Sequence, residues 1–470
     1  MNKFGVRLVS LIMTLVMFVS CFVVGVGAGE TVDSGDYRYY LNDNGMAVID
    51  KYLGSASVVQ IPEYIDGHRV VKLDDWAFEN NEYVTDVTMP NSVEKMDAGV
   101  FQGCKNLKSV TLSNNLKEIP TLTFMGCVSL KSLDIPNGVE KIGQNVFEEC
   151  ISLEKVTIPD SVVGIDYYAF KNCESLKSLT LSKNMKKIWN GAFRKCTGLE
   201  SIVIPEGVTS IGADAFHGCS NLRYVVLPES LEYVEEFALN NNQNRRLYFK
   251  GDHPRISYNN VQDYTWVFYK NGTVGWPSNP IHGTYFEMFA DVSFDEWYLD
   301  SVGYAISHGL MNGTSSTEFK PNAAMDRAML VTVLWRLDGS PKVAAKHPFT
   351  DIKADWYADA VAWAYENKIV MGTSATTFSP ETSVSREQTA TILYRYAEYK
   401  GEALDASADM TGYPDVKNVS DWAYSGVSWA VGENLISGTT TENGGHVYLS
   451  PKVNATRAQV ATILMRFCDR

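Results

Sequence analysis

Three arginines, Arg327, Arg386 and Arg457, stand at corresponding positions of a motif that occurs three times in the C-terminal part of the chain. Each follows Asp, Ser or Thr, residue types that cap helix N-termini, so each is predicted to lie in the first turn of a helix. A guanidinium group binds a carboxylate through two parallel hydrogen bonds, and a helix N-terminus favours an anion. These positions therefore favour binding of an acidic group, although the segment from Ile281 onward carries 15 basic and 23 acidic side chains. The alternative for each arginine is a surface ion pair.

The motif recurs about every sixty residues in a fixed order. An aromatic-x-Asp-aliphatic stretch leads to a tryptophan, and an apolar helical pattern, a glycine turn, a Phe/Leu-x-Pro stretch and a second helix follow. The tryptophans are Trp297, Trp356 and Trp422, and the turn glycines are Gly313, Gly372 and Gly438. The alternative for each tryptophan is a place in the helical core. The aspartates Asp291, Asp351 and Asp415 are expected to be N-caps or turn formers rather than ligands.

A different period, of 23 residues, runs through the preceding part of the chain. It links Cys104, Cys127, Cys150, Cys173, Cys196 and Cys219, and the same interval links a phenylalanine column from Phe101 to Phe216 and a leucine column from Leu107 to Leu222. Each copy holds two short extended pieces and a tight turn. One such coil cannot bury its apolar face alone, so the copies are expected to stack with identical residues in ladders.

The cysteines of this period are predicted to be buried free thiols. Exported chains usually pair their cysteines, which is the alternative. However, removal of Cys21 with a signal segment leaves an odd number, and the six occupy one inward column beside phenylalanine, where a small apolar side chain packs well. Zinc sites need closely spaced pairs with histidine, so no metal is expected.

The pattern Leu-x-x-Val-x-Ile-Pro followed by Val-x-x-Ile-x-x-x-Ala-Phe-x-x-Cys resembles the leucine-rich repeats of BspA-like bacterial surface antigens. The resemblance covers about residues 37–280 and implies a β-rich solenoid of about 23-residue coils. Its outward columns, for example the one from Lys108 to Arg223, mix charges; they predict a solvated face or a contact strip for a protein or glycan. A terminal hairpin with a turn at Asn271-Gly272 is expected to cap the stack, and 277–283 is expected to be a linker.

The threefold motif resembles the S-layer homology (SLH) domain, with copies at 281–340, 341–404 and 405–470. The resemblance implies an α-helical pseudo-trimer whose grooves hold a secondary cell-wall polysaccharide with acidic pyruvyl ketals. It implies that the three arginines bind the ketal and that the three tryptophans and three glycine turns line the grooves. Asp326 departs from the family pattern and weakens the first copy, and Asn443–His446 adds residues to the third. Arg386 is therefore ranked first.

Composition and the N-terminus place the chain outside the cell. A formal net charge of −14 disfavours nucleic acid and anionic lipid as partners. Residues 1–28 combine a basic start, an apolar run and small residues, so they are predicted to be a cleaved signal peptide, after which no membrane segment is expected. A retained membrane helix and a lipoprotein anchored at Cys21 are the alternatives. The end of the sequence shows no apolar sorting tail, which favours non-covalent attachment.

The combined prediction is a secreted, multidomain protein of a Gram-positive-type surface, cell wall or S-layer. The SLH copies would anchor it non-covalently, and the repeats would be presented for protein or glycan binding and adhesion. It is not expected to be an enzyme and needs no cofactor. The alternatives are a structural surface-layer subunit and a wall-attached polysaccharide hydrolase, although the acidic residues of the repeats lie in solvent-facing columns without a paired acid and base in a cleft.

Overall fold

The computed structural model describes residues 29–470 except 241–244, 279, 281, 344–346 and 441–446. The predicted signal peptide lies outside the described residues. The chain divides into two compact units. Unit 1 contains residues up to 222 together with 230–242 and 255–260, and unit 2 contains 223–229, 243–254 and 261–470. Each unit is described by itself.

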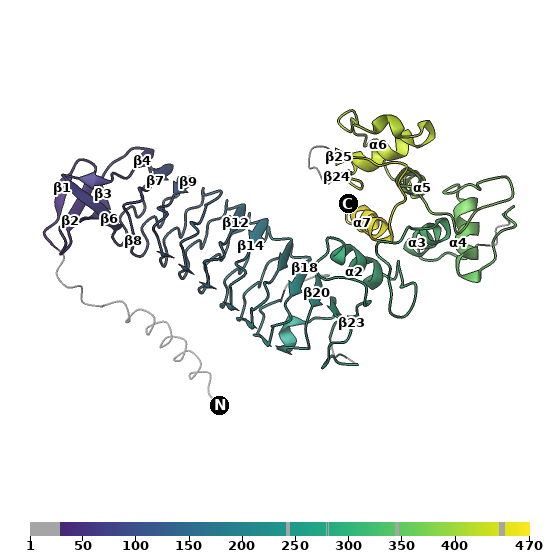
Figure 1. Cartoon of the computed structure of the whole chain (residues 1–470), viewed down its shortest axis with the longest axis horizontal. Helices are drawn as coiled ribbons and strands as arrows, with labels where there is room; N and C mark the ends of the chain where they lie inside the picture. Colours follow the sequence, from purple (N-terminus) through teal and green to yellow (C-terminus); the bar gives the residue numbers. More distant parts are fainter. Residues whose placement is uncertain (1–28, 241–244, 279, 281, 344–346, 441–446) are drawn as a thin grey trace, which may run out of the picture. The chain divides into compact units, whose positions relative to one another are not determined.

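Unit 1 is a β-solenoid, as the 23-residue period predicts (Figure 1). Successive coils pair in parallel with a register of exactly one period, as in Ile142 opposite Ile165 and Ile188 opposite Ile211. One row of short strands is β8 (Lys95–Met96), β10 (Glu118–Ile119), β11 (Lys141–Ile142), β13 (Gly164–Ile165), β15 (Lys187–Ile188), β17 (Ser210–Ile211), β19 (Tyr233–Val234) and β21 (Arg255–Ile256). The other row is β4 (Val58–Gln60), β7 (Asp86–Thr88), β9 (Ser109–Thr111), β12 (Lys155–Thr157), β14 (Ser178–Thr180) and β16 (Ser201–Val203).

The first coil is covered by antiparallel strands. These are β1 (Val32–Ser34), β2 (Tyr37–Leu41) and β3 (Ala47–Tyr52), and β3 pairs in parallel with β6 (His68–Leu73). A short hairpin joins β5 (Tyr64–Ile65) to β6. The change from antiparallel to parallel pairing therefore marks the start of the stack.

The interior of the solenoid consists of the predicted ladders. The phenylalanine and cysteine columns are fully buried, and the rings of Phe124, Phe147 and Phe170 stack with centroids 5.6 and 4.8 Å apart. Each thiol of the column donates to the carbonyl of the phenylalanine 26 residues earlier; the Cys150 Sγ to Phe124 O distance is 3.2 Å. The described cysteines are free. Burial raises the pKa of the Cys104 thiol to about 12, which keeps it protonated as a hydrogen-bond donor.

Each coil also contains a residue in the left-handed backbone region at one fixed position. The column runs Trp76, Gly99, Leu122, Asn145, Tyr168, Gly191, Asp214 and Phe237, all with φ between 56 and 65°. Glycine is required where a bulky neighbour covers it, because a Cβ on Gly99 would lie 2.0 Å from the Trp76 ring and one on Gly191 would lie 2.3 Å from the Tyr168 ring. The tight turn is thus a property of the coil, not of its glycines.

Unit 2 begins with a parallel sheet made of β18 (Tyr224–Leu227), β20 (Arg245–Phe249), β22 (Thr265–Tyr269) and β23 (Thr284–Glu287). The 3-10 turn Tyr258–Asn260 lies before β22 in the chain. The predicted hairpin cap is wrong, because the turn at Gly272 is followed by Trp276, which stacks on Tyr269, and the next strand pairs in parallel. The strands on both sides of the predicted linker belong to one sheet, and the domain limits given above stay predictions.

The rest of unit 2 contains helices in the predicted threefold order. The first copy holds α2 (Leu299–Ser307) and α3 (Arg327–Leu337), the second α4 (Asp355–Glu366) and α5 (Arg386–Tyr399), and the third α6 (Tyr424–Gly432) and α7 (Arg457–Cys468). The third copy also has 3-10 turns at Val416–Asn418 and Asp421–Ala423 and a hairpin of β24 (Thr439–Thr440) and β25 (Val447–Tyr448). Helices pack between copies, α3 with α4, α5 with α6 and α2 with α7.

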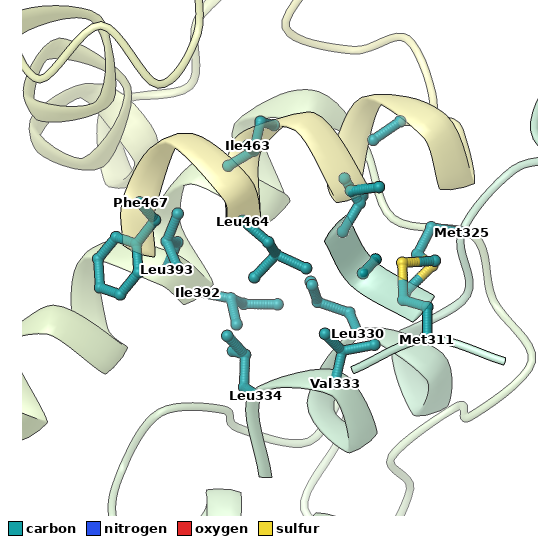
Figure 2. Packing of buried hydrophobic residues seen from close by; sticks show 14 of the residues in the cluster. Met311, Met325, Leu330, Val333, Leu334, Ile392, Leu393, Ile463, Leu464 and Phe467 are labelled. Atoms are coloured by element: carbon teal, nitrogen blue, oxygen red, sulfur yellow. The ribbon is translucent and has the colours of Figure 1, made fainter. Parts of the chain in front are cut away.

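The second helices of the three copies form a common core. Figure 2 shows Leu334 of α3, Leu393 of α5 and Leu464 of α7 pointing toward one another. All three are buried, as the sequence predicts. Among the described residues, none of the helices is long and apolar enough to cross a membrane.

Candidate functional site

The three arginines occupy the first position of their helices. Asp326 caps α3, and Ser385 and Thr456 form capping boxes with the glutamines three residues later. The predicted helix starts are thus confirmed. The side chains are not surface ion pairs, however. Arg327, Arg386 and Arg457 are only 8, 6 and 5% exposed.

Each arginine instead reaches into the next copy of the motif. The Nε of Arg327 donates to Phe378 O, that of Arg386 to Leu449 O, and that of Arg457 to Phe319 O, at 2.7–2.9 Å. The first copy therefore contacts the second, the second contacts the third, and the third contacts the first. The arginines close a ring of contacts around the pseudo-threefold arrangement.

The terminal nitrogens separate Arg386 from its two equivalents. Nη2 of Arg327 donates to Met371 O at 2.8 Å, and Nη2 of Arg457 donates to Asn312 O at 2.7 Å. Each of these two guanidinium groups also lies over a phenylalanine ring. The terminal nitrogens of Arg386 make no hydrogen bond to the described residues. Its planar end remains available for a bidentate contact.

The third copy explains this difference. In the first two copies the turn glycine, Gly313 or Gly372, has an ordinary φ, and the carbonyl of the preceding residue accepts from the arginine. In the third copy Gly438 has a φ of +73°, and the β24–β25 hairpin follows it. The preceding carbonyl, that of Ser437, consequently accepts no hydrogen bond from Arg386 among the described residues.

A cavity of about 410 Å³ lies over α7, which we call the α7 groove. Its lining includes Trp297 from the first copy, Arg386 from the second, and Gly438 with part of α7 from the third. The sequence-predicted residues therefore meet, but each groove takes its residues from all three copies. Burial lowers the pKa of Arg386, and the charge of Asp415 opposes this shift.

A second cavity of about 370 Å³ lies over α3, which we call the α3 groove. It combines Trp356 from the second copy, Arg457 from the third and Gly313 from the first. The remaining predicted residues, Arg327, Gly372 and Trp422, occupy the equivalent positions around α5. The relation between the copies is thus cyclic.

The tryptophans are not core residues. Trp297, Trp356 and Trp422 are 61, 52 and 56% exposed, although large aromatic side chains gain most from burial. The core tryptophans of this unit are others, Trp363 and Trp429, which are 1% exposed. Exposed rings beside two cavities provide flat apolar surfaces next to a charged group.

The glycines and aspartates hold the loops that form the grooves. A Cβ on Gly313 would lie 2.3 Å from the Phe289 ring, and one on Gly372 would lie 2.5 Å from Phe349. Both carboxylate oxygens of Asp291, Asp351 and Asp415 accept from consecutive backbone N–H groups at the start of the x-Pro stretch, for example Phe319 and Lys320. The prediction that these aspartates form turns is confirmed.

Asp326 affects a different groove from the one expected. Its charge acts on Arg457, not on the neighbouring Arg327, and it therefore weakens the α3 groove for an anion. Burial raises the pKa of Asp326, and the hydrogen bond from the Met329 amide opposes that shift. The corresponding caps, Ser385 and Thr456, carry no charge.

The sequence analysis missed a second arginine in each groove. Arg466 lines the α7 groove and Arg336 lines the α3 groove, and Arg395 stands at the equivalent position of α5. The signal was present, because each of these residues follows the first arginine of its helix by the same spacing. The helical pattern placed them near the end of an amphipathic helix, where a basic residue is ordinary.

One acidic group in unit 1 has the spacing of metal ligands. Carboxylate oxygens of Asp74, Asp75 and Asp97 lie within 4.8 Å of one another. Lys72 donates to Asp74 at 2.9 Å and also pairs with Asp97. The ammonium group neutralises the cluster, so the arrangement is explained by the ion pairs.

Comparison with known proteins matches both parts of the chain. The model of the BspA type leucine rich repeat region matches six copies within residues 58–246, and the S-layer homology domain matches 289–328, 348–390 and 412–461. Solved structures include a Treponema pallidum leucine-rich repeat protein, 30% identical over 44% of this chain and 86% of that chain, with a TM-score of 0.33. A leucine-rich repeat protein of Bacteroides ovatus is 25% identical over 51 and 70%, with a TM-score of 0.44.

Curated relatives are enzymes and surface proteins that are much longer. The amylopullulanase of Thermoanaerobacterium thermosulfurigenes is 28% identical over 47% of this chain and 12% of its own length. The surface-layer 125 kDa protein of Lysinibacillus sphaericus is 32% identical over 36% of this chain and 14% of its own length. The chain spans 12 to 18% of the first three curated relatives. It belongs to the BspA-type leucine-rich repeat proteins in its N-terminal part and carries three S-layer homology domains in its C-terminal part.

Proposed function

We propose that the protein is attached to the cell surface by its S-layer homology domains, which bind an acidic secondary cell-wall polysaccharide, and that the repeats are presented for binding a protein or glycan. The observation that carries the first part is the α7 groove. It joins a guanidinium group with unbonded terminal nitrogens to an exposed tryptophan ring. A carboxylate of a sugar fits the first, and the apolar face of a sugar ring fits the second.

The grooves are expected to contribute unequally. Arg386 can bind an anion without giving up a protein contact, whereas Arg327 and Arg457 already donate to turn carbonyls. The α3 groove also contains the influence of the Asp326 carboxylate. The α7 groove is therefore the principal site, and a pyruvyl ketal is the acidic group suggested by the family resemblance.

Surface location rests on the same domains. Relatives that carry S-layer names, from Lysinibacillus sphaericus and Bacillus thuringiensis, and a cellulosome-anchoring protein of Acetivibrio thermocellus, share sequence with this chain. Such a location agrees with export through a signal peptide at 1–28, and attachment would be non-covalent. A Gram-positive-type wall is the proposed setting.

We propose binding without catalysis for both parts. The chain is related to glycosidases over at most 18% of the length of the first three relatives. The threefold domain that it shares with surface-layer proteins supports a role in attachment. Turnover of wall polysaccharide by the purified protein, abolished by substitution of one carboxylate, would contradict this view. Self-assembly into sheets would identify the alternative, a structural surface-layer subunit.

The test of attachment uses the chain of residues 29–470 and purified wall sacculi. The wild-type protein should sediment with native walls and stay in solution with walls from which the polysaccharide has been stripped. Arg386→Ala should weaken binding by about tenfold or more, because charged hydrogen bonds contribute about 1.5–3 kcal/mol. Wild-type binding by Arg386→Ala would refute the assignment of the α7 groove.

Two variants control for effects on folding. Arg327→Ala removes an equally buried arginine with more hydrogen bonds to the protein, so a merely structural loss should be at least as large there. It is expected to bind better than Arg386→Ala. Arg69→Ala removes the same charge from an exposed ion pair in unit 1 and should bind as the wild type does.

A further inference from the structure

The α7 groove contains two arginines rather than one. Arg386 and Arg466 both line it, and the lining includes no aspartate or glutamate. The α3 groove repeats the arrangement with Arg457 and Arg336. The surrounding segment is acidic overall, so paired arginines in a cavity without an acidic partner are a local property of the site.

The two arginines of the α7 groove differ in depth. Arg386 is 6% exposed, whereas Arg466 is exposed. Nη1 of Arg466 makes long contacts of 3.3 and 3.4 Å to the carbonyls of Leu435 and Asn434. Its Nε and Nη2 make no hydrogen bond, and the group makes no ion pair, within the described part of the chain. The carbonyls hold one edge of the guanidinium and leave the other edge toward solvent.

Charge sets what such a cavity can hold. Two like charges in one cavity repel each other, and the repulsion grows as water is displaced. Asp415 acts on Arg386 from behind, but its oxygens are already bonded to the amides of Leu449 and Ser450. A ligand with a single carboxylate would neutralise one arginine and leave the other. A ligand with two acidic groups would neutralise both.

We propose that the α7 groove binds an acidic glycan through two anionic groups, one on Arg386 at the buried end and one on Arg466 at the exposed end. This inference rests on the proposed function and narrows its substrate class to glycans that carry acidic groups on neighbouring units. The volume of about 410 Å³ lies in the range of about 300–1,000 Å³ that is typical of small-ligand sites.

The experiment compares galacturonic acid with digalacturonic acid by calorimetry on the chain of residues 29–470. The wild-type protein should bind the diacid about tenfold more tightly than the monoacid, since one added charged contact contributes about 1.5–3 kcal/mol. Arg466→Gln should reduce this ratio to about twofold or less while monoacid binding persists, and Arg466→Lys should keep part of it. Arg386→Gln should weaken both ligands. Arg223→Gln, which removes an exposed arginine of unit 2, should leave the ratio unchanged.

The outcomes separate this inference from the proposed function. Equal affinity for the two acids, no measurable binding of the diacid, or an unchanged ratio in Arg466→Gln would overturn the two-anion site. The sedimentation of walls with wild-type protein and Arg386→Ala reports on attachment independently of these titrations. Loss of wall binding in the wild type would refute attachment itself. Thermal unfolding of each variant verifies that the fold is retained.

Discussion

The buried ion pair between Arg246 of β20 and Asp300 of α2 should be required for the stability of unit 2. The two side chains are 5 and 11% exposed and meet through two hydrogen bonds of 2.5 and 2.9 Å. Tyr248 donates to the same carboxylate at 3.3 Å, and its ring shares a core with Val302 of α2. The last parallel strands and the first S-layer homology helix are thus packed together.

Asp300→Asn removes the charge but keeps the shape. Burial alone would lower the pKa of Arg246, but the hydrogen bonds and charge of Asp300 outweigh that effect and raise it. The arginine therefore remains charged in the variant and loses its partner. Breaking a buried pair in this way costs about 3–5 kcal/mol of unfolding free energy. An exposed pair in the same unit, Arg223 with Asp469, should cost less than about 1 kcal/mol when Arg223 is replaced by Gln.

Urea unfolding followed by near-ultraviolet circular dichroism measures the difference. Asp300→Asn should lower the midpoint of the transition that reports unit 2, and the double variant Arg246→Met, Asp300→Leu should recover most of it, because no charge is left unpaired. Similar midpoints for Asp300→Asn and Arg223→Gln would refute the reasoning. So would a double variant as unstable as the single one.

Three further outcomes follow from the ladders and the caps. Phe147→Ala should cost about 3–5 kcal/mol in thermal unfolding because both neighbouring rings lose their stacking partner, whereas Cys150→Ala should cost clearly less. Of the seven described cysteines, only Cys468, which is not fully buried, should react with a thiol reagent in the native protein, and all seven should react in guanidinium; rapid native reaction of more than one would contradict the buried column. Burial raises the pKa of Asp326, so its ionisation opposes folding: stability should fall as pH rises through the pKa of this group, and Asp326→Thr should remove that pH dependence.

The solenoid could be predicted from the sequence in detail because identity at one spacing specifies both neighbours of every coil. The phenylalanine and cysteine columns state which side chains touch, and the structure has them in contact. The end of the stack could not be predicted in this way. Asn271-Gly272 is typical of a two-residue hairpin, but the strand that follows the turn pairs in parallel with β22 instead. Local turn chemistry does not determine the strand partner.

The site was predicted in its members but not in its assembly. The spacing of the three arginines, tryptophans and glycines identified equivalent residues, and the two grooves contain them. Equivalence does not tell which copy supplies which member. The depth of Arg386 and its unbonded terminal nitrogens depend on Gly438 and the hairpin after it, which are long-range effects.

The circular order of the arginine contacts has a consequence for how such a chain can change over time. Each recess borrows one flat ring and one cation from its two neighbours, so deleting a single copy removes a component from every recess at once. A coil of the solenoid, by contrast, can be duplicated or lost with the register of its neighbours preserved. The reach of the molecule is free to vary in steps of 23 residues, whereas its point of attachment survives only as a triplet.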